Sequence, residues 1–535
     1  MRKYFARPAQ GEWLLNWRQL SSYSFGGMIG SGWLLSASSV AGQAGKLAWV
    51  AWVIGGGVML VIAIVMTELA RRWKKDGGLT WWPYMSSGPL VAMITVAAIW
   101  LIYALNPASE STAAVELGSQ WFHWLYKSSA QDPAQGQLTW PGFGVAAVLA
   151  ALLIATSLLA LRLITAFTVV ATAVKIIVPL IVLVLLIRSG IGTGHDYSSS
   201  NDSISSVLTA VTSGGVVYTY TGFQAPIDFG GHTRASARGV RLSIIGPIVF
   251  GIVLLTLLQV FSAQHRVLGW NGVDYSSGYV HLAAGLGIWH MFLEWLIKID
   301  TIGSPLSCGV VFTTALAFVI NSLVGEDLVP AAVGPQREVE CRRWVSGKLL
   351  VINYVVSLLF LLFLRDWSSQ VDESCVIFVF SYAAPSVSLF ALILRDLPPG
   401  QHAWAKTRQF GLPGVLAPVS FVSMTIILYE ADPGVLIISI GLVLAMTAVL
   451  VYLRPATWKA RKEPEWKDSL KLGLLLIAYL CAVAALCAVR QHWTSGRWPV
   501  VFDVTAVLLG FWAFYALVDT SVSYMRSYPP PDSGA

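Results

Sequence analysis

Long apolar runs recur along almost the whole chain, and they constrain its fold more than any other feature. Each run holds roughly 20 mainly apolar residues, which is enough for a helix to cross the hydrocarbon core of a bilayer. Only 12% of the residues are charged, whereas a soluble protein is about a quarter charged. The chain therefore lacks the polar side chains to cover its apolar surface in water, and we predict an all-α integral membrane protein.

The pattern predicts about fourteen membrane-spanning helices. They centre on residues 20–40, 47–69, 89–118, 142–161, 164–187, 206–229, 241–262, 291–321, 348–364, 374–394, 413–429, 434–453, 470–489 and 500–520. Most of the 35 Lys and Arg residues fall in alternate connections. Because basic residues concentrate on the cytoplasmic side, we predict a multi-pass protein of the cell (plasma or inner) membrane with both termini in the cytoplasm.

Two of these runs contain residues that interrupt helices. The first run holds Gly26, Gly27, Gly30 and Gly32, and each glycine in a helix interior costs up to about 1 kcal/mol relative to alanine. The sixth run holds Gly222 and Pro226, and proline removes a backbone donor. Discontinuous helices in corresponding positions predict an inverted-repeat transporter. The alternative is that the glycines only let helices cross closely.

A broken helix exposes backbone groups where a substrate can bind. A half-helix N-terminus carries roughly +0.5 charge and can hold a carboxylate, while free carbonyls suit an ammonium group. A zwitterion such as an amino acid fits both. The predicted substrate-binding residues come from the two interruptions: Ile29, Gly30, Ser31, Gly32 and Trp33 in the first run, and Tyr220, Thr221, Gly222 and Phe223 in the sixth. For Trp33, plain packing is an equal alternative.

At these residues the sequence resembles a known family. Ile29-Gly30-Ser31-Gly32-Trp33-Leu34 is similar to the first-span signature of the amino acid–polyamine–organocation superfamily of permeases. Phe223-Gln224-Ala225-Pro226-Ile227-Asp228 resembles the sixth-span signature of its proton-coupled aspartate-permease-like branch. Three places depart from the family pattern. The segment Gly230-Gly231-His232-Thr233-Arg234-Ala235-Ser236 stands where the family has an acidic residue and an Asn-Pro pair, Gly45-Lys46 replaces a Gly-Pro after the first span, and Phe318 replaces a basic residue.

The resemblance covers about residues 15–455 and implies the five-plus-five inverted-repeat fold of the bacterial leucine transporter. With the span count, it implies six segments. These are a cytoplasmic segment (1–18), the first repeat with spans one to five (19–190), the second repeat with spans six to ten (191–395), spans eleven and twelve (396–455), spans thirteen and fourteen (456–520), and a disordered cytoplasmic tail (521–535).

A few charged residues lie inside predicted spans. Placing Lys175 at a helix centre costs roughly 2.5–3.5 kcal/mol. The resemblance implies that its ammonium replaces a sodium ion and couples transport to protons; the alternative is a fixed cation bonded to span-one carbonyls. Asp300 is a candidate proton carrier or ammonium ligand, or else a salt-bridge partner of a neighbouring helix. Glu294 and Lys298 are spaced to pair with each other, and Glu110 is a candidate pocket-facing acid.

These features predict a secondary active transporter of an amino acid, working by alternating access with proton symport or exchange. Its expected partners are the amino acid or amine substrate, protons and the lipid bilayer, without nucleic acid. The sequence has no phosphate-binding GxxxxGK[ST] loop and no metal or nucleophile–base motif, so we expect neither a cofactor nor an enzyme. The alternatives are a transporter of amines or other organic cations, and a membrane sensor that no longer transports.

Overall fold

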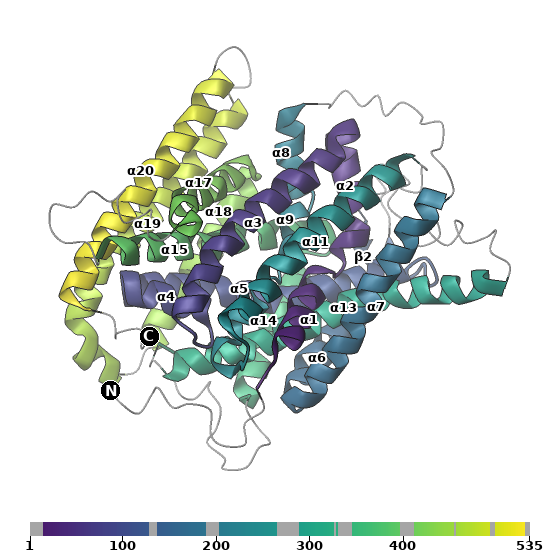
Figure 1. Ribbon diagram of the computed structural model, residues 1–535, viewed down its shortest axis with the longest axis horizontal. Coiled ribbons are helices and arrows are strands. Elements are labelled where there is room, and N and C mark those ends of the chain that lie inside the picture. The colour runs from purple at the N-terminus through teal and green to yellow at the C-terminus, as the bar shows by residue number, and fades with distance from the viewer. Residues whose placement is uncertain are drawn as a thin grey trace.

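The computed structural model describes residues 14–127, 136–188, 203–264, 288–325, 328–329, 345–395, 411–453, 456–492 and 498–529. These residues are almost entirely helical, and two short strands, β1 (Tyr126–Lys127) and β2 (Gln137–Leu138), pair antiparallel. Eleven helical segments of the described chain are long and apolar enough to cross a membrane. Figure 1 shows them packed as one bundle.

The helices follow the predicted runs closely. In chain order they are α1 (Trp17–Met28), α2 (Gly32–Ala44), η1 (Gly45–Leu47), α3 (Ala48–Arg72), α4 (Gly78–Ser87), α5 (Pro89–Gly118), α6 (Trp140–Ala155), η2 (Thr156–Leu158), α7 (Leu161–Arg188), α8 (Ile204–Ser213), α9 (Val216–Tyr220), α10 (Ala225–Asp228), η3 (Gly230–His232), α11 (Ala237–Gln264), α13 (Ile288–Gly325), α14 (Gly347–Phe363), α15 (Trp367–Arg395), α17 (Leu412–Glu430), α18 (Pro433–Leu453), α19 (Ala456–His492) and α20 (Trp498–Ser527). The first, sixth and ninth predicted runs hold shorter helices (α1 and α2, α8 to α10, and α14), so the count of fourteen spans stays a prediction.

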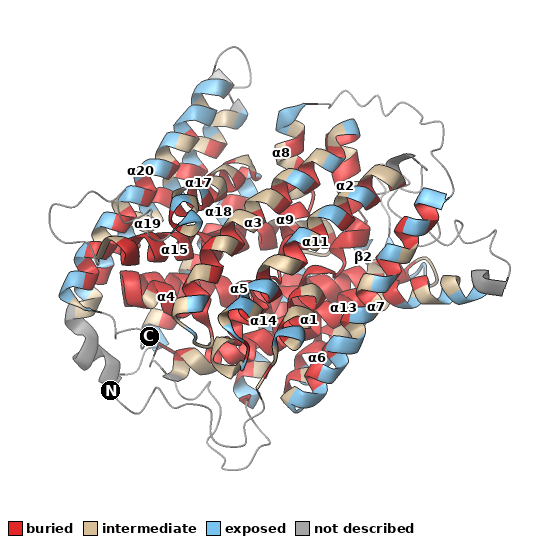
Figure 2. Cartoon of the chain, in the orientation of Figure 1, coloured by how far each residue is buried: buried red, intermediate tan, exposed pale blue. Residues whose placement is uncertain are grey.

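Helix α5 forms the centre of the bundle. Its most apolar window is fully buried, and it packs against α13, α15, α4, α14 and α6. In peripheral helices such as α18 and α20, only 33% and 28% of the corresponding window is buried (Figure 2). Large apolar side chains on their outer faces, including Ile437 and Leu508, are exposed. An apolar outer surface of this extent suits lipid rather than water.

The chain ends differ slightly from the predicted segments. Helix α1 already begins at Trp17, because Asn16 and Gln19 form a capping box there. Helix α20 continues to Ser527, so residues 521–527 do not belong to the disordered tail that was predicted from residue 521. Tyr524 and Met525 are buried against the bundle, and this burial extends the helix.

Candidate substrate-binding site

The first predicted run is broken where the glycines predict a break. Helix α1 ends at Met28 and α2 begins at Gly32, which leaves Ile29, Gly30 and Ser31 outside both helices. Ile29 has φ −90° and ψ 84°, which is not a helical conformation. The prediction of a discontinuous first helix is therefore confirmed.

The sixth predicted run is broken twice. Gly215, with φ +80°, separates α8 from α9, and Gly222, with φ +98°, lies between α9 and α10. L-residues with side chains rarely adopt such φ values, whereas glycine does so at little cost. Pro226 lies in the first turn of α10, where its missing N–H is not needed. The predicted discontinuity is confirmed here as well.

The two breaks touch each other through backbone. A Cβ added to Gly27 would lie 2.9 Å from the Cα of Gly222. The Ser24 hydroxyl donates a hydrogen bond of 3.2 Å to the Phe223 carbonyl. Glycine at positions 27 and 222 therefore also lets the two broken runs cross closely. Close crossing was the alternative explanation of these glycines.

A central pocket lies beside these breaks, and the side chains around it leave almost no open space within it. The predicted residues Gly30, Gly32 and Thr221 contribute to its wall. The other lining residues come from α1, α5, α9 and α13: Gly27, Met28, Asn106, Glu110, Tyr218, Thr219, Cys308 and Phe312. Both broken runs and the buried helix α5 thus meet at one site.

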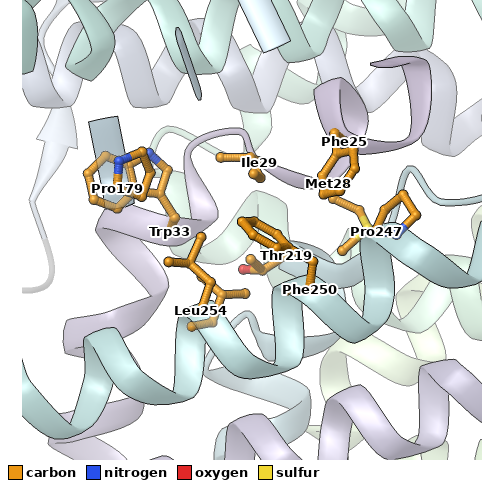
Figure 3. Close-up of a pocket in the computed structure, with 11 residues that line it drawn as sticks. Phe25, Met28, Ile29, Trp33, Pro179, Thr219, Pro247, Phe250 and Leu254 are labelled. Carbon is orange, nitrogen blue, oxygen red and sulfur yellow. The ribbon is translucent and has the colours of Figure 1, made fainter. Parts of the chain in front are cut away.

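Ile29 and Trp33 line a different pocket, which is almost wholly apolar. Figure 3 shows their side chains facing a space that Phe250 and Leu254 of α11 close from the other side. Thr219 lines both pockets. The side chains of Ile29 and Trp33 therefore do not line the central pocket, although they flank the same break.

Tyr220 and Phe223 also lie outside the central pocket. The Tyr220 hydroxyl donates to the Trp52 carbonyl at 3.1 Å, and its ring packs against the Trp52 ring. The Phe223 ring packs against Tyr382. Both side chains are fully buried, and their contacts are those of packing residues.

Glu110 occupies the N-terminus of α2. Its Oε2 accepts a hydrogen bond from the Ser31 amide at 3.1 Å, and its Oε1 accepts one from the Tyr218 hydroxyl at 2.9 Å. A Cβ on Gly30 would lie 2.7 Å from Oε1. The amide that was predicted to hold a substrate carboxylate thus already holds a carboxylate of the protein.

Lys175 faces the other side of the first break. Its Nζ donates to the Gly26 carbonyl at 2.7 Å, and the side chain is 1% exposed. Its ammonium interacts electrostatically with Glu110 and Asp300. This is the bond to a span-one carbonyl that the fixed-cation alternative requires, and the coupling role of Lys175 stays a prediction.

Asp300 is buried on α13, where Lys175 acts on it electrostatically, and neither of its carboxylate oxygens has a hydrogen-bond partner among the described residues. It thus belongs to the charged group beside the first break. Glu294 and Lys298, earlier on the same helix, pair with each other at 2.5 Å, as their spacing predicts. Within the described ranges, no cluster of three or more His, Cys, Asp or Glu residues is arranged to hold a metal ion.

Sequence reasoning missed several polar residues of the site. Asn106 donates to the Tyr218 hydroxyl at 3.3 Å, and Ser304 donates to the Ile29 carbonyl at 3.1 Å. The Cys308 thiol donates to the Gly27 carbonyl at 3.2 Å. Ser304 and Cys308 are spaced by four residues, which places them on one helix face, but only the fold shows that this face meets the first break.

Comparison with known proteins agrees with this architecture. The model of a family described as amino acid permease matches residues 15–458. The glutamate/serine transporter AimA of Bacillus subtilis is 26% identical over 485 residues, which cover 87% of this chain and 86% of that protein. The aspartate-proton symporter of Bacillus subtilis is 23% identical over 473 residues, covering 85% and 86%. The chain therefore belongs to the amino acid permease family and is a secondary transporter of amino acids.

Proposed function

We propose that this transporter binds an acidic or small hydroxyl amino acid in the central pocket and carries it together with a proton. The observation that carries the proposal is the hydrogen bond between the Ser31 amide and the Glu110 carboxylate. A helix N-terminus whose amide binds a carboxylate within the protein has the geometry to bind that of an amino acid.

The substrate carboxylate would take the place of Glu110 at the start of α2. Ser31 and Gly32 supply backbone amides there, since Ser31 is the N-cap of α2 and Gly32 its first residue. Helix α2 has 13 residues, so its aligned peptide dipoles favour negative charge at this end. Binding would therefore require Glu110 to move or to lose its charge.

Asn106 is the proposed ligand for the substrate ammonium. It lines the pocket, it is buried, and its Oδ1 has no hydrogen-bond partner among the described residues. An ammonium group provides three donors, and a buried unsatisfied acceptor gains from one of them. The spacing between the α2 terminus and Asn106 would then select a zwitterion over a simple amine.

The named relatives support the choice of side chain. One is a glutamate/serine transporter and the other an aspartate-proton symporter. The Thr219 and Thr221 hydroxyls line the pocket and suit a short polar group. We therefore name glutamate, aspartate and serine as the substrates to test first.

Proton coupling is assigned to the group formed by Lys175, Glu110 and Asp300. One cation lies near two carboxyl groups, so adding a proton to either acid changes the balance of charge around the first break. A protonated Glu110 would hold the Ser31 amide less strongly, because hydrogen bonds to ionised acceptors are roughly twice as strong. Protonation would thus free the α2 terminus for the substrate.

Alternating access would come from the two proposed repeats, residues 19–190 and 191–395. The broken helices occupy corresponding positions in them, which supports rocking of one bundle against the other around a fixed site. We place the protein in the cell membrane with both termini in the cytoplasm, following the distribution of basic residues.

The test is uptake of radiolabelled glutamate, aspartate and serine into proteoliposomes, with and without an inward proton gradient. We expect uptake of at least one of them, increased by the gradient and competed by neutral zwitterions. Competition by simple amines alone would favour the organic-cation alternative. Binding without uptake would favour the sensor.

A further inference from the structure

A chain of hydrogen bonds leads from the sixth-run break to a further buried carboxyl, that of Asp228. The Gly222 amide and the Tyr382 hydroxyl both donate to Gln224 Oε1 at 2.8 Å. Gln224 Nε2 donates to the Tyr103 hydroxyl at 3.4 Å, and that hydroxyl donates to Asp228 Oδ2 at 2.5 Å. The backbone beside the central pocket is thus linked to Asp228, at the end of α10.

Asp228 lacks the partners that an ionised carboxylate needs. Its side chain is 0% exposed, and Oδ1 has no hydrogen-bond partner among the described residues. No described Lys, Arg or His side chain forms an ion pair with it. Its titratable neighbours are Tyr103 on α5, Tyr382 on α15 and the Asp76 carboxylate of the α3–α4 connection, which repels a second negative charge.

Burial of an unpaired charge is so costly that such a group takes up a proton instead. The alternative is a carboxylate stabilised by one tyrosine hydroxyl. It would leave Oδ1 without water and without a hydrogen bond to replace that water. We propose that Asp228 is a proton-binding site of the transport cycle, separate from the group around Lys175. This inference rests on the proposed proton coupling and adds the residue from which the proton leaves.

The contacts around Asp228 suggest how the proton is released. The Asp228 carbonyl accepts the Gly77 amide at 3.1 Å, so the α3–α4 connection covers this end of α10. In that connection Asp76 accepts the Gly231 amide at 2.8 Å and pairs with His232 Nδ1 at 2.5 Å. Moving this connection away would admit water, in which the carboxyl ionises and gives up its proton.

His232 and Phe318 connect this cover to α13. Both are positions where the sequence departs from the family pattern, and their rings pack at 4.9 Å between centroids. The two departures therefore form one contact next to the Asp76–His232 pair. In this chain the α3–α4 connection and the His232–Phe318 contact together cover Asp228. This cover opens on the side of the membrane that we propose faces the cytoplasm.

The decisive variant is Asp228→Asn, which keeps the shape and an acceptor for Tyr103 but cannot bind a proton. In proteoliposomes loaded with a pH-sensitive dye, we expect it to retain substrate counterflow and to lose substrate-driven proton entry. Tyr103→Phe is the control, since it removes the hydrogen bond that Asp228→Asn can keep and leaves the carboxyl in place; it should retain proton entry. Wild-type proton entry by Asp228→Asn would overturn the inference.

A second measurement does not depend on transport. Infrared spectroscopy of the purified wild-type protein at neutral pH should show the carbonyl stretch of a protonated carboxylic acid that is missing in Asp228→Asn. Identical spectra in this region would overturn the inference, even if transport is intact. Absence of amino-acid uptake by the wild-type protein, in contrast, would contradict the proposed function and leave this infrared result to decide on Asp228.

Discussion

The Nζ of Lys175 donates a 2.7 Å hydrogen bond to the Gly26 carbonyl, which ties α7 to the last turn of α1 just before the first break. The same ammonium interacts with Glu110 and Asp300, which lie on two further helices. One side chain thus links the broken helix to both buried acids of the site.

Replacing Lys175 with alanine tests its coupling role. We expect Lys175→Ala to insert and fold but to lose the dependence of uptake on pH, since the two acids lose their shared cation. Lys298→Ala is a suitable control, because that lysine pairs with Glu294 on its own helix. Uptake by Lys175→Ala that varies with pH as in the wild type would support the fixed-cation alternative.

Replacing Gly30 with a larger residue tests whether the central pocket binds the substrate. Gly30→Val should abolish substrate binding, because its Cβ would lie 2.7 Å from Glu110 Oε1 and 2.9 Å from Cys308 Sγ. Gly57→Val is the matched control, since a Cβ there meets nothing within 4 Å. Isothermal titration with the transported amino acid measures the effect, and wild-type affinity in Gly30→Val would exclude this pocket as the site.

Glu110→Gln tests the competition at the α2 terminus. The amide keeps an acceptor for Ser31 but gives up charge-assisted bonds that are stronger by about 1 kcal/mol. A weaker internal competitor should raise substrate affinity roughly fivefold, because about 1.4 kcal/mol corresponds to a factor of ten. Glu373→Gln, at a buried acid bonded to Ser439, should leave affinity unchanged. Equal affinities in Glu110→Gln and the wild type would argue against competition.

Tyr220→Phe tests the assignment of Tyr220 to packing. It removes the hydrogen bond to the Trp52 carbonyl, so we expect a stability loss of about 1 kcal/mol with unchanged substrate affinity. Thermal unfolding in detergent and ligand titration measure the two quantities. A large loss of substrate affinity without a loss of stability would show that Tyr220 is a binding residue.

The positions of the breaks could be predicted because glycine and proline act locally. Gly30 and Gly222 interrupt their helices for reasons contained in a few neighbouring residues. The direction of each side chain could not be predicted in the same way. Tyr218 and Tyr220 are two residues apart, so they point to nearly opposite sides of α9, and the face depends on the turn that Gly215 makes before this helix. Hence Tyr220 was chosen and Tyr218, which contacts Glu110, was missed.

Contacts between residues far apart in the sequence account for the other features that could not be predicted. Glu110 stood out as an acid inside a predicted span, but its role depends on where α5 passes the first break, 79 residues away in sequence from Ser31. The helical end of the chain at 521–527 likewise depends on Tyr524 packing beside Gly88. Neither contact has a signature in the local sequence.

A structure determined with a bound amino acid tests the central claim most directly. The account predicts that the substrate carboxylate lies within hydrogen-bond distance of the Ser31 amide and that the Glu110 carboxyl has moved away from it. A bound amino acid whose carboxylate lies elsewhere, with Glu110 still on Ser31, would contradict it.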